Sequence, residues 1–376
     1  MVVALALNGG PQPDMQELCA LAASAGARVV GQITGRRDRP DPALFVGSGK
    51  AEEIGRLCTE CQADLVVFDH TLSPGQQRNL GRALNRRVIA RVALILDIFA
   101  LRARSHEGKL QVELAQLDYL SARLVRGWTH LERQRGGIGL RGPGETQLET
   151  DRRLIGQRVK QLRLRLAAVE RQRKNRLRQR SRKGTFSVSL VGYTNAGKST
   201  LFNALTHAGV YAADQLFATL DTTSRRVFLA PGEFMVLSDT VGFIRDLPHS
   251  LIEAFKSTLT EAAEADLLLH VIDASDPDRD AHRQAVELVL SEVGAADVPR
   301  IEVMNKIDSA GLSSRSEAGP DGRIRRVWAS AASGEGLVGL REAVRSHVPA
   351  FPSPETWPGT LSDNVGSLQP SVQSLL

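Results

Sequence analysis

One octapeptide constrains the fold of this chain more than any other segment. Residues 192–199 read Gly-Tyr-Thr-Asn-Ala-Gly-Lys-Ser, a complete G-x-x-x-x-G-K-S motif. The apolar run Val188–Val191 precedes it, and the helix-favouring segment Thr200–Thr206 follows it. This order predicts a strand, a glycine-rich loop and a helix, with backbone N–H groups converging on phosphate oxygens at the helix N-terminus. Such a unit belongs to an α/β fold built on a largely parallel sheet.

The loop and the start of its helix are expected to bind a nucleotide. Lys198 would neutralise the β- and γ-phosphates, and Ser199 would ligate Mg²⁺. Asn195 has two interpretations: it is a simple loop residue, or it ligates K⁺ as in the potassium-activated GTPases whose G-x-x-N-x-G-K-S spacing it resembles. The residues expected to bind nucleotide here are Gly192, Tyr193, Thr194, Asn195, Ala196, Gly197, Lys198, Ser199 and Thr200.

Three further motifs follow in order, each after an apolar strand. In Asp239-Thr240-Val241-Gly242, Asp239 would hold Mg²⁺ and the Gly242 N–H would meet the γ-phosphate. In Asn305-Lys306-Ile307-Asp308, the Asp308 carboxylate can accept both N1–H and N2–H₂ of guanine, a pair that adenine lacks. In Ser330-Ala331, a backbone N–H would meet guanine O6. The four motifs together predict a P-loop GTPase that binds and hydrolyses GTP with Mg²⁺.

The segment 217–223 lies where a first switch loop is expected. Thr219 is the predicted contact of the γ-phosphate and Mg²⁺, with Thr222 and Thr223 as alternatives. Lys198, Thr219 and Gly242 are the predicted catalytic residues. Phe243 follows Gly242, where Ras-like enzymes place a glutamine that orients water, and an aromatic ring cannot do so. Slow intrinsic hydrolysis is therefore expected.

The N-terminal residues alternate strand-like and helical runs, which favours βαβ units around a small parallel sheet. The expected strands are Val2–Leu7, Arg28–Ile33, Asp64–Phe68 and Arg87–Ala90. Gly47-Ser48-Gly49-Lys50 lacks the spacing of a phosphate loop and is interpreted as a turn, with nucleotide binding as the alternative. Cys58 and Cys61 form a C-x-x-C within a helical pattern without a second pair, so we interpret them as helix residues, with a metal or redox site as the alternative.

A basic connector is expected between the two α/β regions. Lys109–Gln134 and Glu145–Arg182 have the pattern of long helices around a glycine-rich loop, residues 135–144. Leu148, Ile155, Leu162 and Val169 recur every seven residues, and Val159 and Leu166 complete an apolar seam. Residues 121–183 hold 19 Lys and Arg against 5 Asp and Glu, although the whole chain has a net charge of only +6. The excess favours contact with a nucleic acid over a merely solvated face.

The expected organisation is an N-terminal βαβ-type domain (1–108), a basic helical hairpin (109–184), a Ras-like P-loop GTPase domain (185–348) and a disordered tail (349–376). No apolar run approaches the roughly 18 residues that span a bilayer, and Met1–Leu7 is a better first strand than a signal peptide. With three cysteines in 376 residues, a reducing compartment is expected. We therefore expect a cytoplasmic monomer.

Over about residues 29 to 348 the chain resembles the HflX family of ribosome-associated P-loop GTPases. The resemblance implies binding of GTP and GDP. It also implies binding of the large ribosomal subunit through residues 121–183 to split stalled ribosomes. The hairpin loop, residues 135–144, would then reach toward the peptidyl transferase centre. Thr222 stands where the resemblance leads us to expect Pro after Leu220-Asp221, and from the short tail we expect the extra C-terminal domain of some relatives to be absent. The segments that carry the resemblance are Asp41–Ala43, residues 47–50, Asp69–His70, Leu72–Leu80, Leu94–Phe99, Glu107–Ala115, Gly136–Gly139 and Gly142–Arg153.

Two other functions are compatible with parts of this pattern. A GTP-dependent switch that binds ribosomes, or marks their assembly without splitting them, needs the same motifs and the same basic surface. An RNA-modifying enzyme would need catalytic groups outside the GTPase motifs, and no Cys, His and Asp constellation supplies them.

Overall fold

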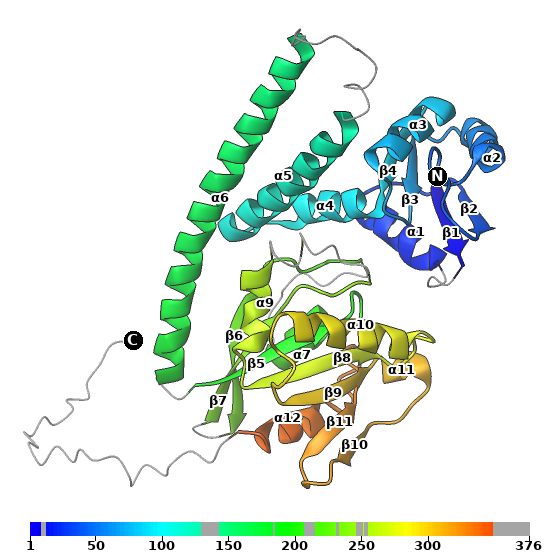
Figure 1. Ribbon diagram of the computed structural model, residues 1–376. Helices are drawn as coiled ribbons and strands as arrows, with labels where there is room; N and C mark the ends of the chain where they lie inside the picture. Colours follow the sequence, from blue (N-terminus) through cyan, green and yellow to red (C-terminus); the bar gives the residue numbers. More distant parts are fainter. Residues whose placement is uncertain are drawn as a thin grey trace, which may run out of the picture.

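The N-terminal βαβ pattern forms a four-stranded sheet in the computed structural model, in which every strand pair is parallel. The strand order is β2-β1-β3-β4. This confirms the predicted small parallel sheet (Figure 1). The strands are β1 (Val2–Leu7), β2 (Gln32–Arg37), β3 (Leu65–Phe68) and β4 (Arg87–Ala90), and the helices beside them are α1 (Met15–Ser24), α2 (Ser48–Glu60) and α3 (Pro74–Leu84).

The structure describes residues 1–8, 13–128, 143–182, 185–206, 215–230, 233–245, 251 and 255–348. The loop expected between the two hairpin helices, residues 135–144, lies outside these residues except for its last two positions. The expected tail, residues 349–376, lies entirely outside them. The side chains of residues 124–128, 143–148, 173–182, 230, 233, 256–258 and 260 are also outside the description.

The second strand was predicted at the wrong position. It was expected at Arg28–Ile33, but β2 spans Gln32–Arg37. As an edge strand that pairs only with β1, β2 buries one side chain, Ile33, and can be polar elsewhere. Val29 and Val30, which suggested the earlier start, instead pack from the preceding segment against two different apolar clusters.

Three helices connect the N-terminal sheet to the rest of the chain: α4 (Arg91–Arg102), α5 (His106–Trp128) and α6 (Pro143–Arg182). Helices α5 and α6 pack along each other, as predicted for the connector (Figure 1). Leu162 is fully buried between them, and the Arg158 guanidinium pairs with Glu113 at 2.6 Å. The middle of the predicted seam is confirmed, since the cluster contains Leu110, Leu114, Leu117, Val159, Leu162 and Leu166.

The C-terminal region forms a seven-stranded sheet in the order β10-β11-β9-β8-β5-β7-β6. The outer pairs β6–β7 and β10–β11 are antiparallel, and the inner pairs are parallel. The strands are β5 (Phe186–Gly192), β6 (Thr223–Ala230), β7 (Glu233–Asp239), β8 (Leu267–Asp273), β9 (Arg300–Asn305), β10 (Arg315–Ala318) and β11 (Ile324–Trp328). The helices are α7 (Lys198–Thr206), α9 (Lys256–Ala263), α10 (Arg279–Glu292), α11 (Ile307–Ala310) and α12 (Leu337–Arg345).

One apolar cluster joins the N-terminal region to the seven-stranded domain. It includes residues of α1, α4 and α5 together with residues of α9 and α10. The ring of Phe99 in α4 packs edge-on against Phe217 and Phe255, with centroid distances of 4.7 and 5.0 Å. The first switch loop, which contains Phe217, is therefore fixed to the N-terminal region by apolar contact.

In the described ranges, no helix has both the length and the apolar character needed to cross a membrane. Within the same ranges, no group of three or more His, Cys, Asp or Glu side chains forms a metal-type cluster. Cys58 is buried in α2, and desolvation raises the pKa of its thiol, which agrees with its interpretation as a helix residue.

Candidate functional site

The glycine-rich loop leaves β5 at Gly192 and enters α7 at Lys198, as the motif predicted. Gly197 has φ +92°, and a Cβ there would overlap the side-chain amide of Asn305. Gly192 has φ +152°, and a Cβ there would overlap the Val271 carbonyl. Both positions therefore require glycine, for backbone conformation and for space. Asn195 adopts the left-handed region at φ +61°, which asparagine tolerates better than most residues.

Lys198 lies buried beneath the loop. Its Nζ donates to the carbonyls of Gly192 at 3.0 Å and Tyr193 at 2.8 Å. Desolvation lowers the pKa of Lys198 to about 8, and the nearby Asp239 carboxylate opposes that change. A phosphate bound next to this ammonium would stabilise its charged form and offset the loss of hydration.

A cavity follows the loop and gathers most of the predicted phosphate and switch residues. Phe217 and Ala218 of the first switch loop also line it, together with the nearby Gln215. The predicted residues that line it are Thr194, Asn195, Gly197, Lys198, Ser199, Thr200, Thr219 and Gly242.

Three oxygen-bearing side chains meet beside Lys198. The Ser199 hydroxyl donates to Asp239 Oδ2 at 2.8 Å and lies 2.7 Å from Thr219 Oγ1. Asp239 is fully buried, and its Oδ1 has no hydrogen-bond partner among the described residues. Desolvation raises the pKa of Asp239, against the effect of Lys198. An orphaned carboxylate oxygen beside two hydroxyls suits a hard cation such as Mg²⁺. Of the three candidate threonines, Thr219 has its hydroxyl in this group, whereas Thr223 begins β6.

The third and fourth motifs are joined to the glycine-rich loop through Asn305. Its Nδ2 donates to the Ala196 carbonyl at 2.8 Å, and its Oδ1 accepts the Ala331 N–H at 2.9 Å. The Ser330 N–H donates to the Glu335 carbonyl. Both amides expected near guanine O6 therefore have internal acceptors, so a guanine contact at Ala331 would be shared with Asn305.

The predicted guanine-selecting residues flank this junction. Asp308 is exposed at the start of α11, and hydrogen bonding from Ser330 lowers the pKa of its carboxyl group. Lys306 adopts φ +60°, and its Nζ pairs with Asp273 at 2.7 Å. A carboxylate that is exposed and ionised can accept two N–H groups from a ligand.

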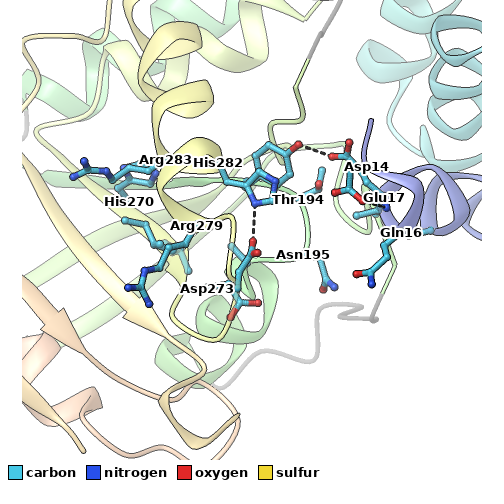
Figure 2. A pocket seen from close by; sticks show the side chains of 17 residues that line it. Asp14, Gln16, Glu17, Thr194, Asn195, His270, Asp273, Arg279, His282 and Arg283 are labelled. Carbon is cyan, nitrogen blue, oxygen red and sulfur yellow. Dashed lines mark hydrogen bonds and ion pairs between the residues drawn. The ribbon is translucent and has the colours of Figure 1, made fainter. Parts of the chain in front are cut away.

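Sequence reasoning missed a buried polar network that links this site to the N-terminal region. Tyr193 does not line the phosphate cavity but a neighbouring one, together with Glu17 and His282. Its ring stacks on His282 at 3.8 Å, and its hydroxyl donates to Glu17 of α1. Figure 2 labels these two partners, His282 and Glu17. Burial, followed by the neighbouring Glu17 carboxylate, raises the pKa of Tyr193. Only the backbone of Tyr193 therefore serves the glycine-rich loop.

Two arginines complete the network. Arg91 pairs with Glu17 and with Asp69, both at 2.7 Å, and all three side chains are buried. Arg245 lies three residues after Gly242, in the segment 240–245 that we call the second switch region. It pairs with Glu17 at 2.8 Å and with Asp69 at 3.4 Å. Burial raises the pKa of Asp69, whereas Arg91 lowers it. The one signal in the sequence was Asp69 itself, placed just after a buried strand.

Three family models match consecutive parts of the chain. They are described as GTP-binding GTPase N-terminal (residues 12–100), GTP-binding GTPase Middle Region (residues 102–180) and 50S ribosome-binding GTPase (residues 187–306).

Curated relatives match most of the chain. GTPase HflX of Escherichia coli (strain K12) is 56% identical over 332 residues, which cover 88% of this chain and 78% of the relative. GTPase HflX of Magnetococcus marinus is 50% identical over 338 residues, covering 89% and 77%. A solved structure of SsGBP with GDP has a TM-score of 0.51 at 24% identity, covering 92% of this chain and 98% of that one. This last similarity supports the fold.

Proposed function

Since this chain belongs to the GTPase HflX family, and is therefore a GTP hydrolase, we propose that it binds the large ribosomal subunit and splits stalled ribosomes in a GTP-dependent manner. The observation that carries the proposal is the match to the ribosome-binding GTPase model over residues 187–306, in a chain whose GTPase domain is attached to a strongly basic helix pair. A ribosomal partner implies a cytoplasmic site of action.

The lining of the phosphate cavity supports the proposed roles of Lys198 and Gly242, and the exposed, ionised carboxylate of Asp308 supports its proposed role at guanine. Lys198 neutralises the β- and γ-phosphates, the Gly242 N–H meets the γ-phosphate, and Asp308 accepts the guanine N–H groups. Ser199, Thr219 and Asp239 would hold Mg²⁺, whose charge stabilises the phosphate oxygens when it is bound. Because hydrolysis is mainly a matter of positioning and electrostatics, these groups suffice for a slow reaction.

Asn195 supports the further proposal of a monovalent cation site. Its side chain lies at the glycine-rich loop, and Asn195 lines the phosphate cavity. The buried Phe243 ring cannot orient water, so a K⁺ ion at Asn195 would supply part of the missing transition-state stabilisation. Turnover is expected to be faster in K⁺ than in Na⁺ buffer, and Asn195→Ala should remove the difference. Equal rates for the native chain would contradict the K⁺ site.

The helix pair supports the RNA contact. Arg152, Arg153, Lys160 and Arg165 are exposed along α6, while Arg158 is used in the contact with α5. Exposed cations along one long helix suit contact with the phosphates of an RNA-lined crevice. We propose that residues 109–184 act as the RNA-binding unit, between an N-terminal domain (1–108) and the GTPase domain (185–348).

Sucrose-gradient sedimentation separates splitting from simple binding. With intact ribosomes, GTP and the protein, we expect the ribosome peak to fall and the subunit peaks to rise. A protein that sediments with intact ribosomes without changing these peaks would be a binding or assembly switch, the alternative function.

Charge reversal on α6 tests whether its exposed cations contact ribosomal RNA. Arg153→Glu with Lys160→Glu should weaken large-subunit binding and reduce its salt slope by about one per lost phosphate contact. The matched control, Arg56→Glu with Arg323→Glu, makes the same charge change on exposed residues of α2 and the β10–β11 turn. If both pairs changed the slope equally, the effect would be one of net charge, and α6 would lose its assigned role.

A further inference from the structure

Asp221 connects the first switch loop to the start of α5. Its Oδ2 accepts the backbone N–H groups of Arg104 at 2.8 Å and Ser105 at 2.7 Å, and its Oδ1 accepts the Ser105 hydroxyl. These donors immediately precede α5, which begins at His106. A carboxylate more than one hundred residues away in the sequence therefore sits at the N-terminus of the hairpin helix.

This contact adds to an ordinary local cap. Ser105 Oγ accepts the Gly108 N–H at 2.8 Å, as in a standard serine N-cap. The N-terminal end of a helix carries partial positive charge, so a second, ionised acceptor is favourable there. Gly108 makes room for it, because a Cβ at that position would overlap Asp221 Oδ1.

The two residues that precede the first switch loop, Gln215 and Leu216, fix its other end. The Leu216 N–H donates to Ser24 Oγ of α1 at 3.0 Å, and Arg102 of α4 donates to Gln215. The Phe217 ring packs on Phe99. Residues 215–221 are thus held by α1, α4 and the start of α5, with Thr219 between the two anchors.

Thr219 is two residues from Asp221, and its hydroxyl is 2.7 Å from Ser199 Oγ. A short covalent path therefore runs from the N-terminus of α5 to the group of oxygens proposed to hold Mg²⁺. A displacement of α5 that breaks the Asp221 contact removes one of the restraints on Thr219, whereas the apolar packing of Phe217 and Leu220 remains.

We propose that Asp221 is a positioning residue that couples the hairpin to the nucleotide site: its contact with the start of α5 holds Thr219 beside Ser199. The coupling is reciprocal, so occupation of the nucleotide site also stabilises the start of α5. The proposal rests on the proposed role of Thr219 at the Mg²⁺ site and is independent of ribosome splitting.

The first test compares the Mg²⁺ dependence of GTP hydrolysis. Asp221→Ala is expected to raise the Mg²⁺ concentration for half-maximal turnover about tenfold, the effect of losing roughly 1.4 kcal/mol of restraint. Asp221→Asn keeps an acceptor for the two N–H groups and should restore part of the loss. Asp266→Ala is the matched control, because Asp266 Oδ2 accepts the Ser187 N–H and hydroxyl, both at 2.7 Å, away from the switch.

Gly108→Ala gives an independent variant that leaves Asp221 in place. Alanine favours helix over glycine, so a purely local role of Gly108 predicts a more stable start of α5. A purely local role would therefore leave the Mg²⁺ concentration for half-maximal turnover unchanged. The proposed coupling predicts that this concentration rises, because the new methyl group displaces the Asp221 carboxylate.

Amide hydrogen exchange at Arg104 and Ser105, whose N–H groups donate to Asp221, measures the coupling between the start of α5 and the nucleotide site directly. In the native chain, Mg²⁺ with a non-hydrolysable GTP analogue is expected to slow exchange at these amides relative to GDP, and Asp221→Ala should abolish the difference. The proposal is overturned if exchange does not depend on the nucleotide, or if Asp221→Ala behaves like Asp266→Ala. Thr219→Ala distinguishes a failure of the Asp221 coupling from a failure of the proposed role of Thr219 at the Mg²⁺ site. If it changes the Mg²⁺ requirement and Asp221→Ala does not, only the coupling is wrong, whereas no effect of Thr219→Ala would overturn the metal role as well.

Discussion

At the scale of single residues, guanine selection depends on one carboxylate. Asp308→Asn should weaken GTP binding roughly 100-fold, since two charge-assisted hydrogen bonds are lost at about 1.5–3 kcal/mol each before partial compensation. The new amide can donate to the keto oxygen of xanthine, so XTP binding should improve. Titration with both nucleotides measures the change, and unchanged GTP affinity would show that Asp308 does not contact the base.

His270 makes the stability of the fold depend on pH. It is buried in β8, its Nδ1 has no partner within the described part of the chain, and desolvation lowers its pKa to about 4. The unfolded chain takes up this proton below pH ~6.5, whereas the folded chain stays neutral until pH ~4. Stability should therefore fall by up to about 3 kcal/mol as the pH decreases through this window.

Denaturant unfolding at several pH values tests this. In His270→Leu, the decrease between pH ~6.5 and ~4.5 should be smaller than in the native chain, because the contribution of this buried imidazole is removed while the other histidines and the carboxyl groups still titrate. Parallel pH profiles for the two chains would show that His270 contributes nothing to the acid sensitivity.

At the scale of elements, helix pairing in the hairpin depends on a narrow seam. Leu162 is fully buried against Leu110 and Leu114, whereas Leu164, two residues along α6, is 65% exposed. Leu162→Ala should destabilise the pair by about 2–3 kcal/mol, and Leu164→Ala by less than about 0.5 kcal/mol. Hydrogen exchange of the α5 and α6 amides measures both. Similar effects of the two variants would mean that α6 does not pack through this seam.

The elements also show what sequence periodicity can predict. The phosphate-binding loop at 192–199 could be predicted from the fixed spacing of its motif. The inner strands and the seam around Leu162 could be predicted because each buries a periodic set of apolar side chains within one short segment. The edge strand β2 was misplaced, since an edge position permits a polar strand and leaves little periodic signal. The caps of α1 and α3, at Asp14 and Ser73, match side chains that typically begin helices.

At the scale of the whole molecule, the features that the sequence did not predict are contacts between distant segments. Arg91, Glu17 and Asp69 form a buried network that reaches Arg245 in the second switch region. Asp221 reaches the start of α5 from the first switch loop. None of these pairs has a characteristic spacing, because their partners are brought together only when the two regions pack. Both switch regions therefore contact the N-terminal half of the chain.

The most direct measurement of the central claim is light scattering from intact ribosomes mixed with the protein. The account predicts a decrease in scattering with GTP, as ribosomes separate into subunits, and a much smaller decrease with GDP. Lys198→Ala, which loses the phosphate-neutralising charge, should abolish the decrease with GTP. Unchanged scattering with native protein and GTP, under conditions where the protein binds the large subunit, would contradict splitting and leave a GTP-dependent binding switch in its place.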